Sequence, residues 1–167
     1  MTALAAERLA YRRSRARRST LVALVSTAVF AALRPGSDIR SSLADGLNAF
    51  LDYVIADPGH EQVMQELVQY SMRTPDLDHL AREQYASYHG AVTELLVGGA
   101  AAAGVIWTRP VTEVARLVVT ITDGVTLAWL ADRDEAAARR VIDFAADSIA
   151  TLAQPIPSRE TATAESR

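Results

Sequence analysis

The side chains best suited to catalysis or metal binding are few in this 167-residue sequence, and their spacing favours neither role. The three histidines are His60, His79 and His89, and none has a second histidine at the spacing of a helical metal site. His79 and Glu83 are four residues apart, which is more typical of an exposed contact on a helix. The sequence contains no zinc-protease, P-loop, dinucleotide-binding or serine-hydrolase motif.

Two residue types are missing altogether, and their absence excludes further chemistry. The chain has no cysteine, so disulfides, thiolate metal sites and cysteine nucleophiles are excluded. It has no lysine either, because all 17 basic residues are arginine, which excludes Schiff-base and P-loop lysine chemistry. We therefore predict no enzyme, no catalytic residue, no metal and no cofactor. A cofactor-free enzyme using His89 with Tyr85 or Asp123 is a minor alternative.

Aromatic and polar side chains interrupt the apolar stripes of several expected helices. A ligand cavity between helices is built in this way, although tyrosine and tryptophan also occur at the edge of an ordinary core. The candidate ligand-binding residues are Tyr70, Tyr85, His89, Asp123 and Trp129. Because few of these groups are charged, we expect an apolar or amphipathic ligand rather than a phosphorylated one.

The elements that would position these residues are helices. Half of the residues are hydrophobic and 22% are charged, which indicates one folded domain rather than a disordered chain. Apolar residues recur at helical spacing between turn signals. The expected helices cover residues 20–33, about 42–55, 60–72, 74–97, about 110–131 and about 134–153.

Local signals indicate where these helices begin and end. Ser41 or Ser42, Thr108 and Asp134 are the predicted N-caps, and Thr74-Pro75-Asp76 is a predicted capped start. Gly98-Gly99 is predicted to end the fourth helix, and Pro155 and Pro157 the last one.

Residues 117–129 allow two interpretations. Their β-branched run around Asp123-Gly124 also has the pattern of a β-hairpin with a two-residue turn. Two lone strands in an otherwise helical chain would be marginally stable, so the context favours a helix.

The charge is distributed unevenly. Residues 1–20 contain six arginines and one glutamate, whereas the remainder carries a net charge of −8, giving −3 for the whole chain. This basic segment is interpreted as a solvated run leading into a core helix, as a nucleic-acid contact, or as part of a signal peptide over residues 1–33 of an exported protein. We expect a basic arm at 1–19, a helical domain at 20–154 and a disordered tail at 155–167.

The order of elements from about 42 to 153 resembles the C-terminal effector-binding and dimerisation domain of TetR-type transcriptional regulators. The residues that carry the resemblance are Leu47-Asn48-Ala49-Phe50-Leu51-Asp52-Tyr53, Ala56-Asp57-Pro58, Glu66-Leu67, Arg73-Thr74-Pro75-Asp76-Leu77, Tyr85 through Leu96, Val114-Ala115-Arg116-Leu117 through Asp123-Gly124, Leu127-Ala128-Trp129-Leu130 and Ala136-Ala137-Ala138-Arg139-Arg140. The resemblance implies an all-α bundle, a small-molecule effector, a homodimer in the cytoplasm, no membrane association and a repressor function. It also favours the helix at 117–129.

Two further expectations follow from the resemblance. The last two helices would form the dimer interface, through Val114, Leu117, Ile121, Val141, Ala145 and Ile149. Family members begin with a three-helix DNA-binding head, for which the roughly 20 residues before Leu21 are too few. We therefore expect a headless regulator, either a truncated or frameshifted product or a stand-alone module, with little or no DNA binding.

Overall fold

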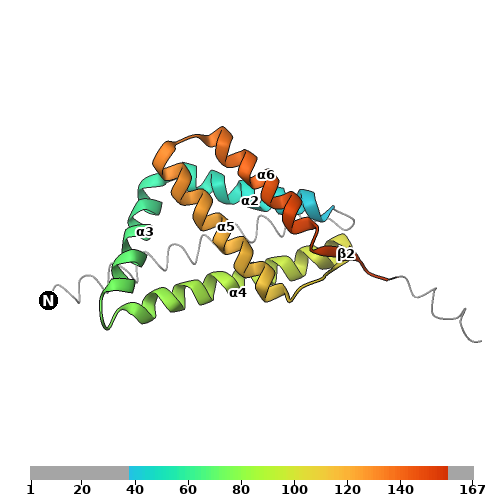
Figure 1. Cartoon of the computed structure of the whole chain (residues 1–167), viewed down its shortest axis with the longest axis horizontal. Helices are drawn as coiled ribbons and strands as arrows, with labels where there is room; N and C mark the ends of the chain where they lie inside the picture. The colour runs from blue at the N-terminus through green and yellow to red at the C-terminus, as the bar shows by residue number, and fades with distance from the viewer. Residues whose placement is uncertain (1–37, 158–167) are drawn as a thin grey trace, which may run out of the picture.

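A computed structural model describes residues 38–157 of the chain. Within these residues the fold is helical, with one short antiparallel ribbon, which confirms the expected all-α class (Figure 1). The elements in chain order are α2 (Ile39–Ala56), α3 (Pro58–Arg73), α4 (Asp78–Ala103), β1 (Val105–Trp107), α5 (Val111–Asp132), α6 (Glu135–Ala150) and β2 (Ala153–Pro155). The predictions for the basic arm, the helix at 20–33, the signal peptide, the DNA-binding head and the tail after 157 concern residues outside the described part.

The core forms where α2 packs on α6 and α5 packs on α4. Figure 1 shows α2 and α6 side by side and α4 across the opposite side of the domain, with α5 running between them. One cluster of buried side chains joins these helices, and its largest fully buried members are Leu51, Val54, Val114, Ile142 and Ile149. Burial of these apolar side chains is the main source of stability in such a domain.

Helix α5 is the most apolar of the described helices. It is the one helix in residues 38–157 long and apolar enough to cross a membrane by length and composition. Seven of its residues are nevertheless buried against neighbouring helices, which is typical of a core helix. The structure confirms the helix over 117–129 in preference to a hairpin.

The N-caps are partly those expected. Asp38 caps α2, and its Oδ2 accepts hydrogen bonds from the backbone N–H of Ser41 at 2.9 Å and from the Ser41 hydroxyl at 3.0 Å. These two bonds lower the pKa of Asp38. The prediction of Ser41 or Ser42 was wrong because α2 begins earlier, at Ile39, and Asp38 before it already caps the N–H of Ser41. Asp134 caps α6 as predicted, at 2.8 Å from the N–H of Ala137.

The turn between α3 and α4 is longer than expected. Helix α3 begins at Pro58 behind the Asp57 cap, and α4 begins only at Asp78. The intervening chain turns at Asp76, whose φ is 70°, and buries Leu77. Thr74-Pro75-Asp76 is therefore a turn and not the capped start of a helix.

Helix α4 continues through Gly98-Gly99 and ends at Ala103, with Gly104 as its C-cap, so the predicted end was wrong. Gly99 and Ala100 are buried, and tertiary packing outweighs the cost of about 1 kcal/mol that a glycine adds inside a helix. Gly104 has φ 66°, the left-handed conformation typical of a helix C-cap.

The ribbon was not predicted, and it changes two helix ends. β1 pairs with β2 in the register Val105–Pro155, Ile106–Gln154 and Trp107–Ala153. Thr108 does not cap α5, because its N–H and hydroxyl both donate to the carbonyl of Leu152, at 2.7 and 2.9 Å. Helix α6 accordingly stops at Ala150, before either predicted stop proline, and Pro155 is part of β2 rather than of a tail.

Replacing Gly90, inside α4, and Gly104, at its C-cap, by alanine should change the free energy of unfolding in opposite directions. Gly104→Ala is expected to lower the free energy of unfolding by about 1 kcal/mol, because alanine is strained at positive φ. Gly90→Ala should raise it by about 0.5–1 kcal/mol, because that residue lies inside the helix with open space around its Cβ position. Urea unfolding of both variants measures the difference. Equal effects would contradict the assigned end of α4.

Candidate functional site

Three of the five predicted ligand-binding residues meet between α4 and α5. The Tyr85 hydroxyl, from α4, donates a hydrogen bond of 2.6 Å to Oδ2 of Asp123 on α5. One turn further along α4, the His89 ring lies 6.1 Å from the Tyr85 ring, centroid to centroid. All three side chains are half-buried. The two helices thus share a polar, aromatic site whose hydrogen bond to a carboxylate is of the stronger kind.

The electrostatics of this site favour a neutral histidine. Burial lowers the pKa of His89, the nearby Arg116 guanidinium lowers it further, and Asp123 acts in the opposite direction. Above the ordinary value near 6.5 the ring is therefore uncharged and can both donate and accept a hydrogen bond.

Further polar side chains are buried in the interior of the domain. Gln84 is 2% exposed and donates to the hydroxyl of Tyr88, whose ring meets that of Tyr85 edge to face at 5.8 Å. Glu61 on α3 and Thr126 on α5 are buried to the same degree. Sequence reasoning did not name these three as site residues. The signal for Gln84 was present, since it lies on the apolar stripe between Ala81 and Tyr88.

Trp129, the fourth predicted residue, lies deeper in the domain. Its side chain is 7% exposed within the main core cluster, and the Arg133 guanidinium lies over the ring at 4.5 Å. This cation–π contact holds the indole in one orientation.

Tyr70, the fifth predicted residue, is not brought to this site. It is 41% exposed on α3 and lines an open groove of about 630 Å³ beside the α3–α4 turn. The groove's lining, which includes Val63, Glu66, Leu67 and Arg73, contains none of the other four predicted residues. The sequence placed Tyr70 with the others because it lies on a helix stripe, but that stripe faces outward.

The predicted dimer residues divide into two groups. Leu117 and Val141 are 41% and 50% exposed, and Ile121 is half-buried. The other three, Val114, Ala145 and Ile149, are at most 5% exposed and fill the core of the chain itself. Periodicity identifies an apolar stripe on a helix but not whether that stripe packs against the same chain or against a second one. Sequence reasoning missed two more exposed apolar side chains on these helices, Leu127 at 62% and Phe144 at 73%.

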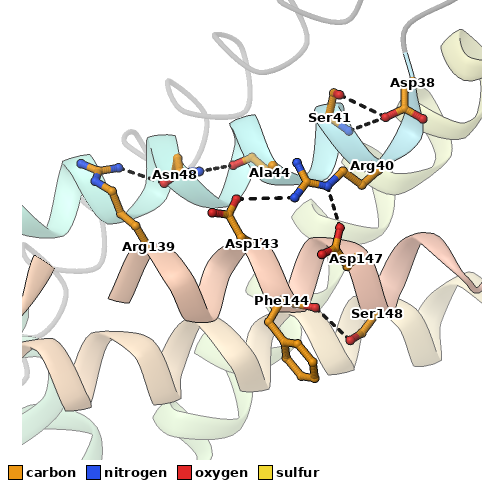
Figure 2. A network of polar contacts seen from close by, with 10 residues as sticks. All are labelled: Asp38, Arg40, Ser41, Ala44, Asn48, Arg139, Asp143, Phe144, Asp147 and Ser148. Carbon is orange, nitrogen blue, oxygen red and sulfur yellow. Dashed lines mark hydrogen bonds and ion pairs between the residues drawn. The ribbon is translucent and has the colours of Figure 1, made fainter. Parts of the chain in front are cut away.

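Arginines join α6 to α2 near both ends of their antiparallel contact (Figure 2). Arg40 lies 2.7 Å from Asp147 and 3.7 Å from Asp143. At the other end, Arg139 binds Asn48 Oδ1 at 2.9 Å, and in addition Asp52 and Glu135, both at 2.7 Å. Because these pairs are solvent-exposed, each contributes little stability, and together they fix the register of the two helices.

Phe144 lies on the opposite side of α6 from these ion pairs. Figure 2 shows its ring pointing away from α2. The α2 contact therefore leaves this large apolar side chain 73% exposed among the described residues.

The described residues contain no group of three histidine, aspartate or glutamate side chains that could hold a metal ion. The comparisons with known proteins point instead to regulation. A family model described as the C-terminal part of BetI-type transcriptional repressors matches residues 40–154. No curated protein and no solved structure gives a significant match.

His89 should make the domain sensitive to mild acid. Its pKa is lower in the folded chain than the ordinary value of 6.5, so as pH falls through that value the unfolded chain takes up a proton that the folded chain resists. The contribution of His89 to the free energy of unfolding is therefore fully present above the pKa of the unfolded chain and decreases below it. Between about pH 7.5 and 5.5, the wild type should lose more unfolding free energy than His89→Gln. Parallel pH dependences of the two proteins in urea unfolding would contradict this assignment.

Proposed function

Because the chain belongs to the BetI-type transcriptional repressors of the TetR family, whose C-terminal domain covers residues 40–154, we propose that this domain binds a small effector and pairs with a second copy of itself. The family consists of regulators and not of enzymes. The observation that carries the proposal is the Tyr85–Asp123 hydrogen bond, which joins α4 to α5 inside a domain of this family.

The proposed effector site lies between α4 and α5. Tyr85 and Tyr88 supply aromatic walls, while Asp123 and the neutral His89 supply a small number of polar groups. Such a composition suits an apolar or amphipathic molecule, since a phosphorylated one would require several cationic partners. Trp129, further along α5, is part of the proposed effector site. Tyr70 is not, because it lines the separate groove on α3.

The proposed dimer surface is the α5–α6 face, defined by Leu117 and Leu127 on α5 and by Val141 and Phe144 on α6. All four are exposed apolar side chains. Gly124 lies between the two leucines in sequence, and the space around its Cβ position is open, so a second helix can approach closely there. Covering these side chains with a second copy would remove apolar surface from water.

Helix α5 would couple the two activities. It carries Asp123 toward α4 and Leu117 and Leu127 toward the proposed partner. An effector that binds the α4–α5 site with different affinity in two positions of α5 would shift the arrangement of the dimer. This is how effector binding would act on a repressor.

A charge at the centre of the α5–α6 face should separate the dimer. Phe144→Arg is expected to sediment as a monomer where the wild type sediments as a dimer, because an arginine would be buried without a partner. The chain itself should still fold, since Phe144 is 73% exposed, and circular dichroism checks this. Val97→Arg, at another exposed apolar site on α4, is the control and should remain dimeric. A dimeric Phe144→Arg protein would contradict the assigned face.

Loss of the Tyr85 hydroxyl should weaken effector binding. A thermal-shift screen of apolar and amphipathic molecules first identifies those that raise the melting temperature of the wild type. Tyr85→Phe is expected to bind these molecules about tenfold more weakly. The variant loses the hydrogen bond from the Tyr85 hydroxyl to Asp123, so the two side chains are no longer held together. Tyr70→Phe removes a hydroxyl outside the site and is the control. Equal affinity of Tyr85→Phe and wild type for every such molecule would exclude this site.

A further inference from the structure

Two buried polar atoms of α5 make no hydrogen bond. Thr126 and Trp129 are 1% and 7% exposed, and within the described part of the chain neither Thr126 Oγ1 nor Trp129 Nε1 has a partner. An indole N–H can only donate, and a hydroxyl can donate or accept. A single hydrogen-bond acceptor placed near both atoms could therefore satisfy both. Buried polar groups are normally paired, because leaving one unpaired costs stability.

Other residues of the same two types do form hydrogen bonds elsewhere in residues 38–157. Trp107, the other tryptophan, donates its Nε1–H to the carbonyl of Leu96 at 3.1 Å. Threonine hydroxyls elsewhere donate to backbone carbonyls, and they belong to Thr74, Thr93, Thr108, Thr120, Thr122 and Thr151. A threonine inside a helix usually has the carbonyl one turn back within reach. The Thr126 hydroxyl does not take that bond and remains available to another acceptor.

The two atoms continue the proposed effector site inward. Asp123, Thr126 and Trp129 follow at intervals of three residues, so they lie on adjoining positions of α5, each about 4.5 Å further along its axis. Asp123 is half-buried and Thr126 is almost fully buried. The row therefore runs from the Tyr85 contact at the accessible end toward the core.

The surroundings restrict the charge of a ligand at the inner end. Trp129 and its neighbour Val125 belong to the apolar core cluster, where a bare charge would be costly to bury. Arg133 lies over the Trp129 ring and would repel a cation. An uncharged oxygen meets both conditions and supplies the acceptor.

We propose that the effector carries an uncharged carbonyl oxygen, as in a ketone, ester or lactone, which accepts hydrogen bonds from Thr126 Oγ1 and Trp129 Nε1. The remainder of the molecule is apolar and lies toward Tyr85. This inference rests on the proposed effector site and adds the chemical class of its ligand. It distinguishes oxygenated neutral molecules from hydrocarbons and from organic cations of the same size.

The test follows the two indole N–H resonances of the full chain by NMR, assigned with Trp107→Phe. The probes are benzylacetone and butylbenzene, which share one carbon skeleton and differ in the ketone oxygen. Benzylacetone should move the Trp129 N–H resonance downfield and bind about tenfold more tightly than butylbenzene. The Trp107 resonance, which already reports a hydrogen bond, should not move. Benzyltrimethylammonium, the cationic probe, should leave both resonances in place.

Thr126→Val removes the hydroxyl with little change of shape. Its affinity for benzylacetone should fall part of the way toward that for butylbenzene, because only the Trp129 N–H remains as a donor, while butylbenzene binds as it does to the wild type. The variant should be at least as stable as the wild type, because no internal hydrogen bond is lost. Thr122→Val is the matched control: it loses its bond to Val119 and should keep the preference for the ketone.

Several outcomes would overturn the ligand class. These are equal affinity for the two neutral probes, a preference that Thr126→Val leaves unchanged, tighter binding of the cation, or a Trp129 resonance already in the hydrogen-bonded range without ligand. If the neutral probes bind equally and Tyr85→Phe weakens both, the effector site stands and only the carbonyl assignment fails. If no probe binds and no molecule in the thermal-shift screen does, the effector site itself fails.

Discussion

The packing of α5 on two sides determines where the other features of this domain lie. Val114, Val118 and Val125 bury one side of the helix among α2, α4 and α6, and this burial fixes its rotation about its axis. Once that rotation is fixed, Asp123 meets Tyr85 and Leu127 faces outward. A small rotation or shift of α5 would change both contacts together, which is why one helix can connect a ligand to a dimer interface.

Three polar or amphipathic side chains of α5 reach toward or into the interior. Asp123 is satisfied by Tyr85 across the helix contact, whereas Thr126 and Trp129 have no acceptor among the described residues. A core optimised for stability alone would place apolar residues at such positions. Binding sites commonly retain polar groups that a ligand satisfies. The domain therefore gives up some stability in the part of α5 where we place the effector.

The helices could be predicted from the sequence because helical periodicity is a local property. Leu43, Leu47, Leu51 and Val54 repeat on one face of α2, and the structure buries all four. The termination at Gly98-Gly99 and the Thr108 cap could not be predicted correctly, because α4 is held straight through its glycines by burial and Thr108 is engaged by Leu152, 44 residues away. Such contacts between distant parts of the chain leave no periodic pattern. Tyr70 likewise lies on the face of α3 that lines a separate groove, which only the packing of α3 shows.

The sequence by itself determined the class of this protein and the chemistry available to it. The chain has no cysteine or lysine, which removes thiolate, disulfide and lysine chemistry. Its periodicity specifies helices, and the order of those helices carries the family resemblance. Only the tertiary structure decided that Tyr85 meets Asp123, that Val114, Ala145 and Ile149 serve the core, and that Phe144 remains exposed. The physical reason is that one helix can bury several of its faces, and the rotation at which it docks depends on the shapes of all its neighbours together.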